Sequence, residues 1–218
     1  MRRRRWRSYI QVCCFLLLGL LLIPSEVYAQ LPKKSQIVVF VPEGGLFLVT
    51  PDDKKVRHLT RDLGLQATDP TWSPDGKNIA FNKGKGICVM DTNGKNQTML
   101  TNEQAQDWWP AWSPDGEKIA FISDRDGNDE VYIMDADGSN QKRLTDNPDP
   151  DGFPDWTSDG KIIFGRGAEV YIMDSDGKNQ KMLIEGAVFP DWLGPSPGQG
   201  VEADGKLNTT WGNIKLNH

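Results

Sequence analysis

The apolar residues of this chain gather in short runs separated by polar, glycine-rich segments. Residues 119–121 read IAF and residues 131–134 read VYIM, and runs of the same kind stand at 79–81 and 162–164. Each run is too short for a helix, and its nearly continuous apolar character is typical of a strand buried on both faces. We therefore expect short strands in sheets that pack against other sheets.

These runs belong to a repeat. WSPDG stands at 72–76 and 112–116, and WTSDG stands at 156–160. A repeat period near 40 residues is typical of stacked or radial architectures. The tryptophans of the repeat lie 40, 44 and 36 residues apart, at Trp72, Trp112, Trp156 and Trp192.

Each unit is predicted to form four strands. The Ser-Pro-Asp-Gly segment after Trp112 predicts a tight turn, because proline presets one backbone angle and glycine allows a positive one. Asp137-Gly138, matched by Asn93-Gly94 and Asp176-Gly177, is a strong hairpin signal between the third and fourth strands. The pattern predicts an all-β fold, a β-propeller of four-stranded antiparallel blades.

The units PAWSPDGEKIAF and EVYIMDADGSNQKRLT resemble the propeller repeats of the TolB family, periplasmic proteins of bacterial envelopes. The resemblance covers about residues 36–192 and implies export and protein association rather than catalysis. TolB carries a further N-terminal domain and its propellers usually have six blades, whereas this chain is expected to encode fewer. The resemblance therefore leaves the partner open.

The two ends of the repeat region are predicted to form one blade together. Residues 36–60 align with the second, third and fourth strands of a unit, whereas VFPDWLG at 188–194 aligns with a first strand alone. Joined, they would remove an exposed sheet edge. We expect a four-bladed monomer whose other blades are 68–101, 108–145 and 152–184. The alternative is an open half-ring that completes itself by self-association.

Residues 1–29 are predicted to be a signal peptide. MRRRRWR precedes an apolar run from Ile10 to Ile23, and PSEVYAQ follows with small residues before a cleavage site after Ala29. The run is shorter than the about 20 residues that span a bilayer, which disfavours the alternative of a membrane anchor. We expect a periplasmic or secreted protein with a propeller domain at 30–194.

The mature chain carries 20 basic and 29 acidic residues, a net charge of −9. An acidic surface disfavours nucleic acid or an anionic membrane as the main partner. Residues 195–206 are rich in glycine and proline and predict a linker, and residues 195–218 form the tail. The more apolar segment 206–216 is either a docking strand or a frayed end.

Two segments match motifs for chemistry, but their sequence context does not favour either one. GPSPG at 194–198 matches G-x-S-x-G, but prolines flank Ser196 where a hydrolase needs a strand and a helix. DRDGNDE at 124–130 has Asp129 where a calcium loop needs glycine, so we interpret it as a turn and keep calcium as the alternative. We expect no enzyme activity, no metal site and no cofactor.

The binding surface is predicted at the loops after the second and fourth strands, which differ from unit to unit. The turns after the first and third strands are nearly identical, so folding constrains them and leaves the varied loops free for function. Trp109 aligns with Phe153 and is expected in the core. Trp108 aligns with residues of the other units that are not aromatic, so folding of the blade does not require a tryptophan there. It is expected either to anchor an interface or to pack on a neighbouring blade. The candidate residues are Lys83, Lys85, Asp107, Trp108, Arg125, Asp126, Asp149, Asp151 and Arg166.

These patterns favour a non-catalytic module that binds another envelope protein. The alternatives are a carbohydrate-binding or accessory propeller of an enzyme system, and a purely structural module.

Overall fold

The computed structural model of the chain describes residues 37–41, 45–50, 55–61, 67–102 and 104–186. Every regular element in these ranges is a β-strand, and no helix able to cross a membrane occurs in them. The predicted signal peptide, the first strand at 188–194 and the tail at 195–218 lie outside the described residues.

The strands form four antiparallel sheets. The N-terminal sheet contains β1 (Ile37–Val41), β2 (Gly45–Thr50) and β3 (Lys55–His58). Blade I contains β4 (Ala67–Trp72), β5 (Asn78–Lys83), β6 (Gly86–Asp91) and β7 (Thr98–Met99). Blade II contains β8 (Asp107–Trp112), β9 (Lys118–Ser123), β10 (Glu130–Asp135) and β11 (Lys142–Arg143). Blade III contains β12 (Asp151–Trp156), β13 (Ile162–Arg166), β14 (Glu169–Met173) and β15 (Lys181–Glu185).

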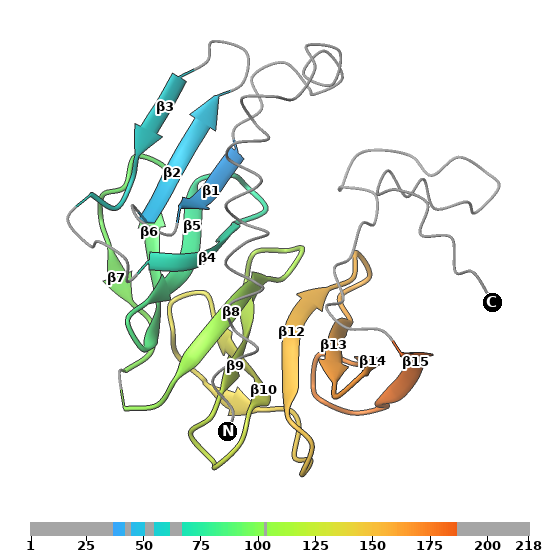
Figure 1. Cartoon of the computed structure of the whole chain (residues 1–218). Helices are drawn as coiled ribbons and strands as arrows, with labels where there is room; N and C mark the ends of the chain where they lie inside the picture. Colours follow the sequence, from blue (N-terminus) through green and yellow to red (C-terminus); the bar gives the residue numbers. More distant parts are fainter. Residues whose placement is uncertain (1–36, 42–44, 51–54, 62–66, 103, 187–218) are drawn as a thin grey trace, which may run out of the picture.

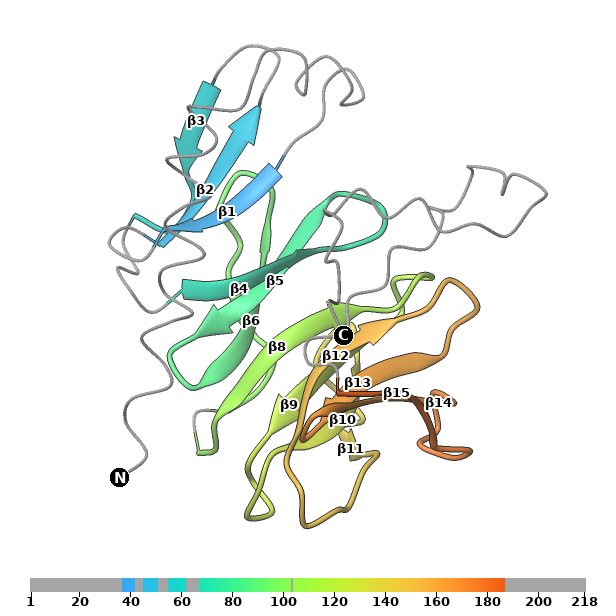
Figure 2. The ribbon, with the colours of Figure 1, turned by 45° about the vertical axis from the view of Figure 1, so that its right-hand side comes forward.

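The sheets follow one another in chain order, and the first strands of neighbouring blades lie side by side (Figures 1 and 2). The predicted blade boundaries are confirmed to within two residues, as is the all-β fold class. The N-terminal sheet has the three strands expected for residues 36–60. Ring closure through residues 188–194 stays a prediction.

Apolar clusters fill the spaces between neighbouring sheets. Phe81 and Leu46 belong to the cluster between the N-terminal sheet and blade I, Phe121 to the one between blades I and II, and Phe164 to the one between blades II and III. All four side chains are fully buried. Three repeat tryptophans each pack in the cluster that joins their blade to the preceding sheet: Trp72, Trp112 and Trp156. Blades I and II are therefore stabilised by neighbouring sheets on both faces, and blade III by blade II on one face within the described residues.

The WSPDG motif forms the turn that joins the first and second strands. In blade I the Ser73 hydroxyl donates to Asp75 Oδ1 at 2.7 Å and accepts from the Asn78 amide at 2.9 Å. The hydrogen bond from Ser73 lowers the pKa of Asp75 to about 2. The same bonds recur at Ser113 and Thr157. The repeated aspartate therefore holds a turn, as expected for a residue that every blade contains.

Neighbouring blades also touch through their backbones. Gly138, in the hairpin between β10 and β11, has a φ of +89°, and a Cβ added there would lie 2.7 Å from the Leu100 carbonyl oxygen of blade I. Gln141 of the same hairpin donates to that carbonyl at 3.1 Å. Gly94 and Gly177 make the same approach to the preceding sheet. The hairpin glycines are thus required by contact between blades as well as by turn geometry.

Gly138→Ala should destabilise the protein more than Gly160→Ala. Gly160 has a similar φ of +80° but no atom within 4 Å of an added Cβ, so its replacement carries only the left-handed backbone cost of about 1–2 kcal/mol. Gly138→Ala adds a clash with backbone atoms that cannot rotate away. Urea unfolding of both variants measures the difference. Equal losses would contradict the proposed role of this contact.

Candidate binding site on the loop face

The loops after the second and fourth strands gather at one end of the blades, which we call the loop face. On blades II and III it is formed by residues 124–129, 144–150 and 167–168, and blade I adds residues 84–85. The opposite end, the turn face, carries the repeated turns. Backbone bonds tie neighbouring loops together, since the Asp107 amide donates to Lys85 O and the Asp151 amide to Asp129 O, each at 2.8 Å.

The first strand of each complete blade contains a β-bulge. Its register shifts between Thr68 and Thr71 in blade I and at the matching places in blades II and III. The residue in the bulge has a positive φ although it is not glycine: +49° at Asp69, +53° at Trp109 and +52° at Phe153. Such a conformation is costly for bulky side chains and is retained only where the surrounding structure enforces it. The backbone is thus the same in three blades, but the side chains it presents differ.

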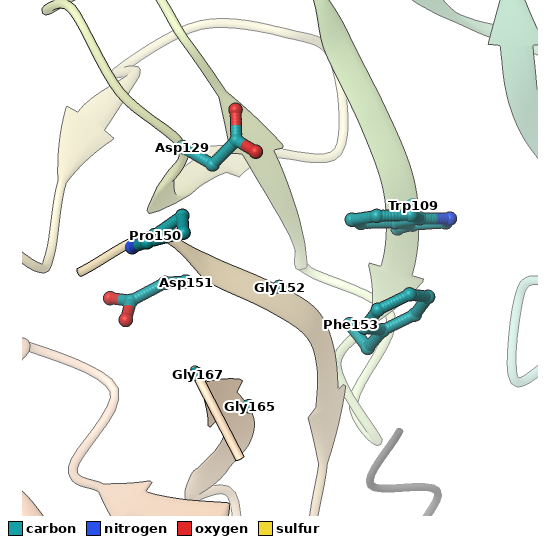
Figure 3. Close-up of a pocket in the computed structure, with 8 residues that line it drawn as sticks. All are labelled: Trp109, Asp129, Pro150, Asp151, Gly152, Phe153, Gly165 and Gly167. Atoms are coloured by element: carbon teal, nitrogen blue, oxygen red, sulfur yellow. The ribbon is translucent and has the colours of Figure 1, made fainter. Parts of the chain in front are cut away.

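Two pockets of about 220 Å³ each meet at Trp109 and Phe153. The two rings stack with centroids 3.8 Å apart, and both are partly exposed. One pocket runs along the bulges and is lined by Asp69, Pro70, Thr71, Trp109, Pro110, Ala111, Phe153, Pro154 and Asp155. The other opens among the loops, and Figure 3 shows its lining: Trp109, Asp129, Pro150, Asp151, Gly152, Phe153, Gly165 and Gly167.

A buried ion pair supports the wall of the loop pocket. Arg166 donates from Nε to Asp151 Oδ1 at 2.7 Å and from Nη2 to Oδ2 at 2.9 Å. The Asp151 side chain is 0% exposed and that of Arg166 is 10% exposed. The guanidinium also lies over the rings of Phe164 and Tyr171. Burial raises the pKa of Asp151, and the bonds from Arg166 oppose that rise.

Blade II repeats this arrangement. Arg125 reaches from the loop to Asp107 at 3.1 Å and lies over the rings of Phe121 and Tyr132. Asp107 is the counterpart of Asp151 at the start of the first strand, and its side chain is also 0% exposed. The two arginines therefore hold the loops to the first strands, and their charges are matched by carboxylates inside the protein.

A third buried carboxylate anchors the loops between the two blades. Glu130 accepts from Arg143 at 2.9 Å, from the Thr145 hydroxyl at 2.6 Å and from the Asn147 amide at 2.9 Å. Its side chain is 0% exposed. Arg143 also lies 2.7 Å from Asp146 and 3.7 Å from Asp126. One guanidinium therefore faces three carboxylates.

The structure brings the predicted site residues to the loop face but separates them by burial. Lys85, Asp126 and Asp149 are exposed, and Lys83 is partly exposed with Nζ 3.4 Å from Gln97. Asp107, Asp151 and Arg166 have little exposed side-chain surface, whereas Arg125 is exposed while it pairs with Asp107. That these four residues bind a partner stays a prediction.

The adjacent tryptophans are both half-buried against the cluster between blades II and III. The Trp108 Nε1 is buried without a partner among the described residues. Trp109 packs on the core as expected, and it also lines both pockets. The bulge explains the place of Trp109 in the pockets. Within it, two residues of β8 lie opposite one residue of β9, so the regular alternation of side chains between the two faces is shifted. Pro110, inside a strand, was the available signal, since proline is confined to edges and bulges.

The described residues contain few further groups for chemistry at or near this face. In the described ranges, no group of three or more His, Cys, Asp and Glu residues could hold a metal ion. His58 stacks on Phe47 in the N-terminal sheet, with centroids 4.2 Å apart, and Cys88 is buried. In the loop at 124–130, Asp124 accepts the Gln106 amide and Asp126 accepts the Tyr132 hydroxyl.

The comparisons with known proteins define the class. The family described as the Tricorn protease N-terminal beta propeller domain matches residues 84–180. A solved protein from Agrobacterium tumefaciens assigned as TolB is 29% identical, with a TM-score of 0.62 over 74% of this chain and 66% of that one. TolB from Acinetobacter baumannii is 24% identical, with a TM-score of 0.59 over 70% and 41%.

A more distant match is an oligogalacturonate lyase in complex with manganese, 12% identical, with a TM-score of 0.54 over 65% of this chain and 46% of that one. This likeness concerns the fold alone. No curated protein matches in sequence. The chain spans less than two thirds of each of these three solved proteins. Together the matches identify the fold as a TolB-like β-propeller, which confirms the resemblance predicted from the repeat units.

Arg166→Met should destabilise the folded state strongly at neutral pH. Removing one partner of a buried ion pair leaves an uncompensated charge and costs about 3–5 kcal/mol. Lys178→Met is the matched control, because Lys178 forms a pair with Asp176 while 78% exposed, and such pairs contribute little. Urea unfolding at pH 7 measures both. Equal effects would contradict the structural role of the Arg166–Asp151 pair.

The loss of unfolding free energy caused by Arg166→Met should become smaller as the pH falls. Without the arginine, burial holds the pKa of Asp151 above its value in the unfolded chain, so the folded state binds the proton more tightly. Stability of the variant relative to the wild type therefore increases as the pH is lowered through that pKa. Unfolding curves between pH 7 and pH 4 test this, and a constant deficit over the range would contradict it.

Proposed function

We propose that this chain is a non-catalytic protein-binding module of the bacterial envelope and that it binds its partner at the loop face. The observation that carries the proposal is the stacked pair Trp109 and Phe153, partly exposed where two pockets meet. Large aromatic side chains in pockets are typical anchors of protein interfaces. The likeness to TolB supports the class of function. The predicted signal peptide supports a location in the bacterial envelope.

The same geometry argues against a hydrolytic site at this face. Three carboxylates of this face are occupied: Asp107 and Asp151 pair with arginines, and Glu130 accepts three hydrogen bonds. Asp129 has no side-chain partner among the described residues, but the residues that line its pocket include no serine, cysteine or histidine for it to activate. A general base needs a free lone pair directed at a substrate. The described loops provide rigid walls around a pocket, which suits binding.

Carbohydrate binding is the second candidate. Its support is the same aromatic pair, because a flat ring at the mouth of a pocket can stack on the apolar face of a sugar. The polar groups that would fix a sugar hydroxyl are fewer, since the carboxylates of Asp107 and Asp151 are occupied by arginine. A glycan array with the mature chain tests this candidate directly.

Trp109→Ala should weaken partner capture. The mature chain is immobilised, proteins captured from envelope extract are identified, and affinity for the main one is measured by surface plasmon resonance. Loss of an aromatic anchor typically costs 2 kcal/mol or more, which corresponds to a decrease in affinity of about 30-fold. Lys77→Ala is the control, since Lys77 is on the turn face and its side chain is 79% exposed.

Thermal melting accompanies each capture experiment, so that loss of folding is distinguished from loss of contact. Trp108→Ala should lower the melting temperature, because its ring packs in the cluster between blades II and III. Equal capture by wild type and a folded Trp109→Ala variant would contradict binding at the loop face. Capture of glycans but of no protein would favour the second candidate.

A further inference from the structure

The loop face of blades II and III presents an excess of negative charge. Three arginines lie there, but each is committed to a buried carboxylate: Arg125 to Asp107, Arg143 to Glu130 and Arg166 to Asp151. The loops carry further carboxylates that we call the acidic rim: Asp126, Asp146 and Asp149, which are exposed, and Asp124 and Asp129, which are half-buried. Arg143 is the only one of the three arginines paired with the rim, at Asp126 and Asp146.

Asp129 is the member of the acidic rim that lines the loop pocket. Its side chain is half-buried and has no hydrogen-bond or ion-pair partner among the described residues, although its backbone oxygen accepts from Asp151. Burial raises the pKa of Asp129, and the charges of Asp124 and Glu130 raise it further. A half-buried carboxylate without a partner is costly, so a cation placed beside it would be stabilising.

The rest of the pocket has room for a flat cation. Trp109 and Phe153 form an aromatic wall, and Gly152, Gly165 and Gly167 place no side chains in the space (Figure 3). A Cβ added at Gly167 would meet no atom within 4 Å. An aromatic face attracts a cation, and the planar guanidinium of arginine stacks on rings better than the ammonium of lysine.

The protein uses the same combination twice within itself. Arg125 lies 4.7 Å from the centroid of Tyr132 while paired to Asp107, and Arg166 lies 4.9 Å from that of Tyr171 while paired to Asp151. The loop pocket has the aromatic rings and the carboxylate but lacks the arginine.

Resting on the function proposed above, we propose that the loop pocket receives an arginine side chain from a basic segment of the partner protein. The guanidinium would lie between Asp129 and the Trp109–Phe153 wall. The acidic rim would attract the basic residues that flank it. The partner is therefore expected to present a cationic segment rather than an apolar helix or an acidic surface.

Capped peptides test this inference without the natural partner. One peptide carries a central arginine flanked by lysines, and a second carries citrulline, which has nearly the same shape but no charge. Calorimetry with the mature chain at low salt should show the arginine peptide binding about tenfold or more tightly than the citrulline peptide. Binding should weaken as salt is added, because the rim is exposed to solvent.

Two variants locate the contact. Asp129→Asn keeps the shape of the side chain and should weaken the arginine peptide by about tenfold or more. Asp137→Asn removes an exposed carboxylate on the turn face and should leave binding unchanged. Asp129→Asn should also raise the melting temperature at pH 7, since it removes a charge whose raised pKa opposes folding, and this gain should disappear below the pKa of Asp129.

The inference is overturned if the two peptides bind alike, if neither binds at low salt, or if Asp129→Asn binds like wild type. These failures are distinct from failure of the proposed function. If the captured envelope protein is lost with Trp109→Ala but retained with Asp129→Asn, protein binding stands and the arginine contact does not. If Trp109→Ala keeps the natural partner, the proposed location fails whatever the peptides do.

Discussion

A blade with two apolar faces can bury them only against neighbouring blades, and the rest of this structure depends on that constraint. Phe81, Phe121 and Phe164 occupy equivalent places in successive clusters between sheets. The hairpin glycines then allow each blade to approach the backbone of the preceding one, as Gly138 does at Leu100. Stability in such an array arises from nearest-neighbour contacts. The repeated residues therefore serve packing, and the loops at one end are free to differ.

The fold was predictable because its signals are local and repeated. Trp112, the Pro-Asp-Gly turn and the Asp-Gly hairpin each specify a short piece of backbone, and their spacing specifies the blade. A Leu-Thr pair recurs at residues 59–60, 100–101 and 144–145. The structure explains its threonine, because the Thr101 hydroxyl accepts a hydrogen bond from the Ile87 amide across the hairpin. Thr60 and Thr145 repeat that bond in their own sheets.

The site was less predictable, because it depends on geometry that alignment cannot supply. Aligning the units on Pro110 placed Trp109 in the core and left Trp108 either as an interface anchor or as packing on a neighbouring blade. Both rings pack on the cluster between blades II and III, and the bulge at Trp109 also brings that ring to the lining of both pockets, which the alignment did not predict. The pairing of Arg125 with Asp107, 18 residues apart, requires the folded positions of a loop and a strand. The sequence signal for this pairing was its repetition, because blade II has Asp107 and Arg125 where blade III has Asp151 and Arg166.

The bulges connect the fold to the proposed function. The positive φ recurs in three blades at Asp69, Trp109 and Phe153, so the backbone feature belongs to the repeated blade of this chain. The side chains at this position differ: blade I presents an exposed aspartate, and blades II and III present two stacked aromatic rings. A shared backbone that presents different side chains toward one space is a means of giving a repeated fold a specific surface.

The central claim is that the loop pocket between Trp109 and Asp129 binds an arginine side chain. Nuclear magnetic resonance of the ¹⁵N-labelled mature chain tests it most directly, with the Trp109 indole signal assigned through Trp109→Phe. Titration with the arginine peptide should shift the Trp109 indole and the amides of residues 129 and 150–153, and leave the turn at Ser113–Gly116 unchanged. Shifts confined to the turn face, or equal shifts with the citrulline peptide, would contradict the account.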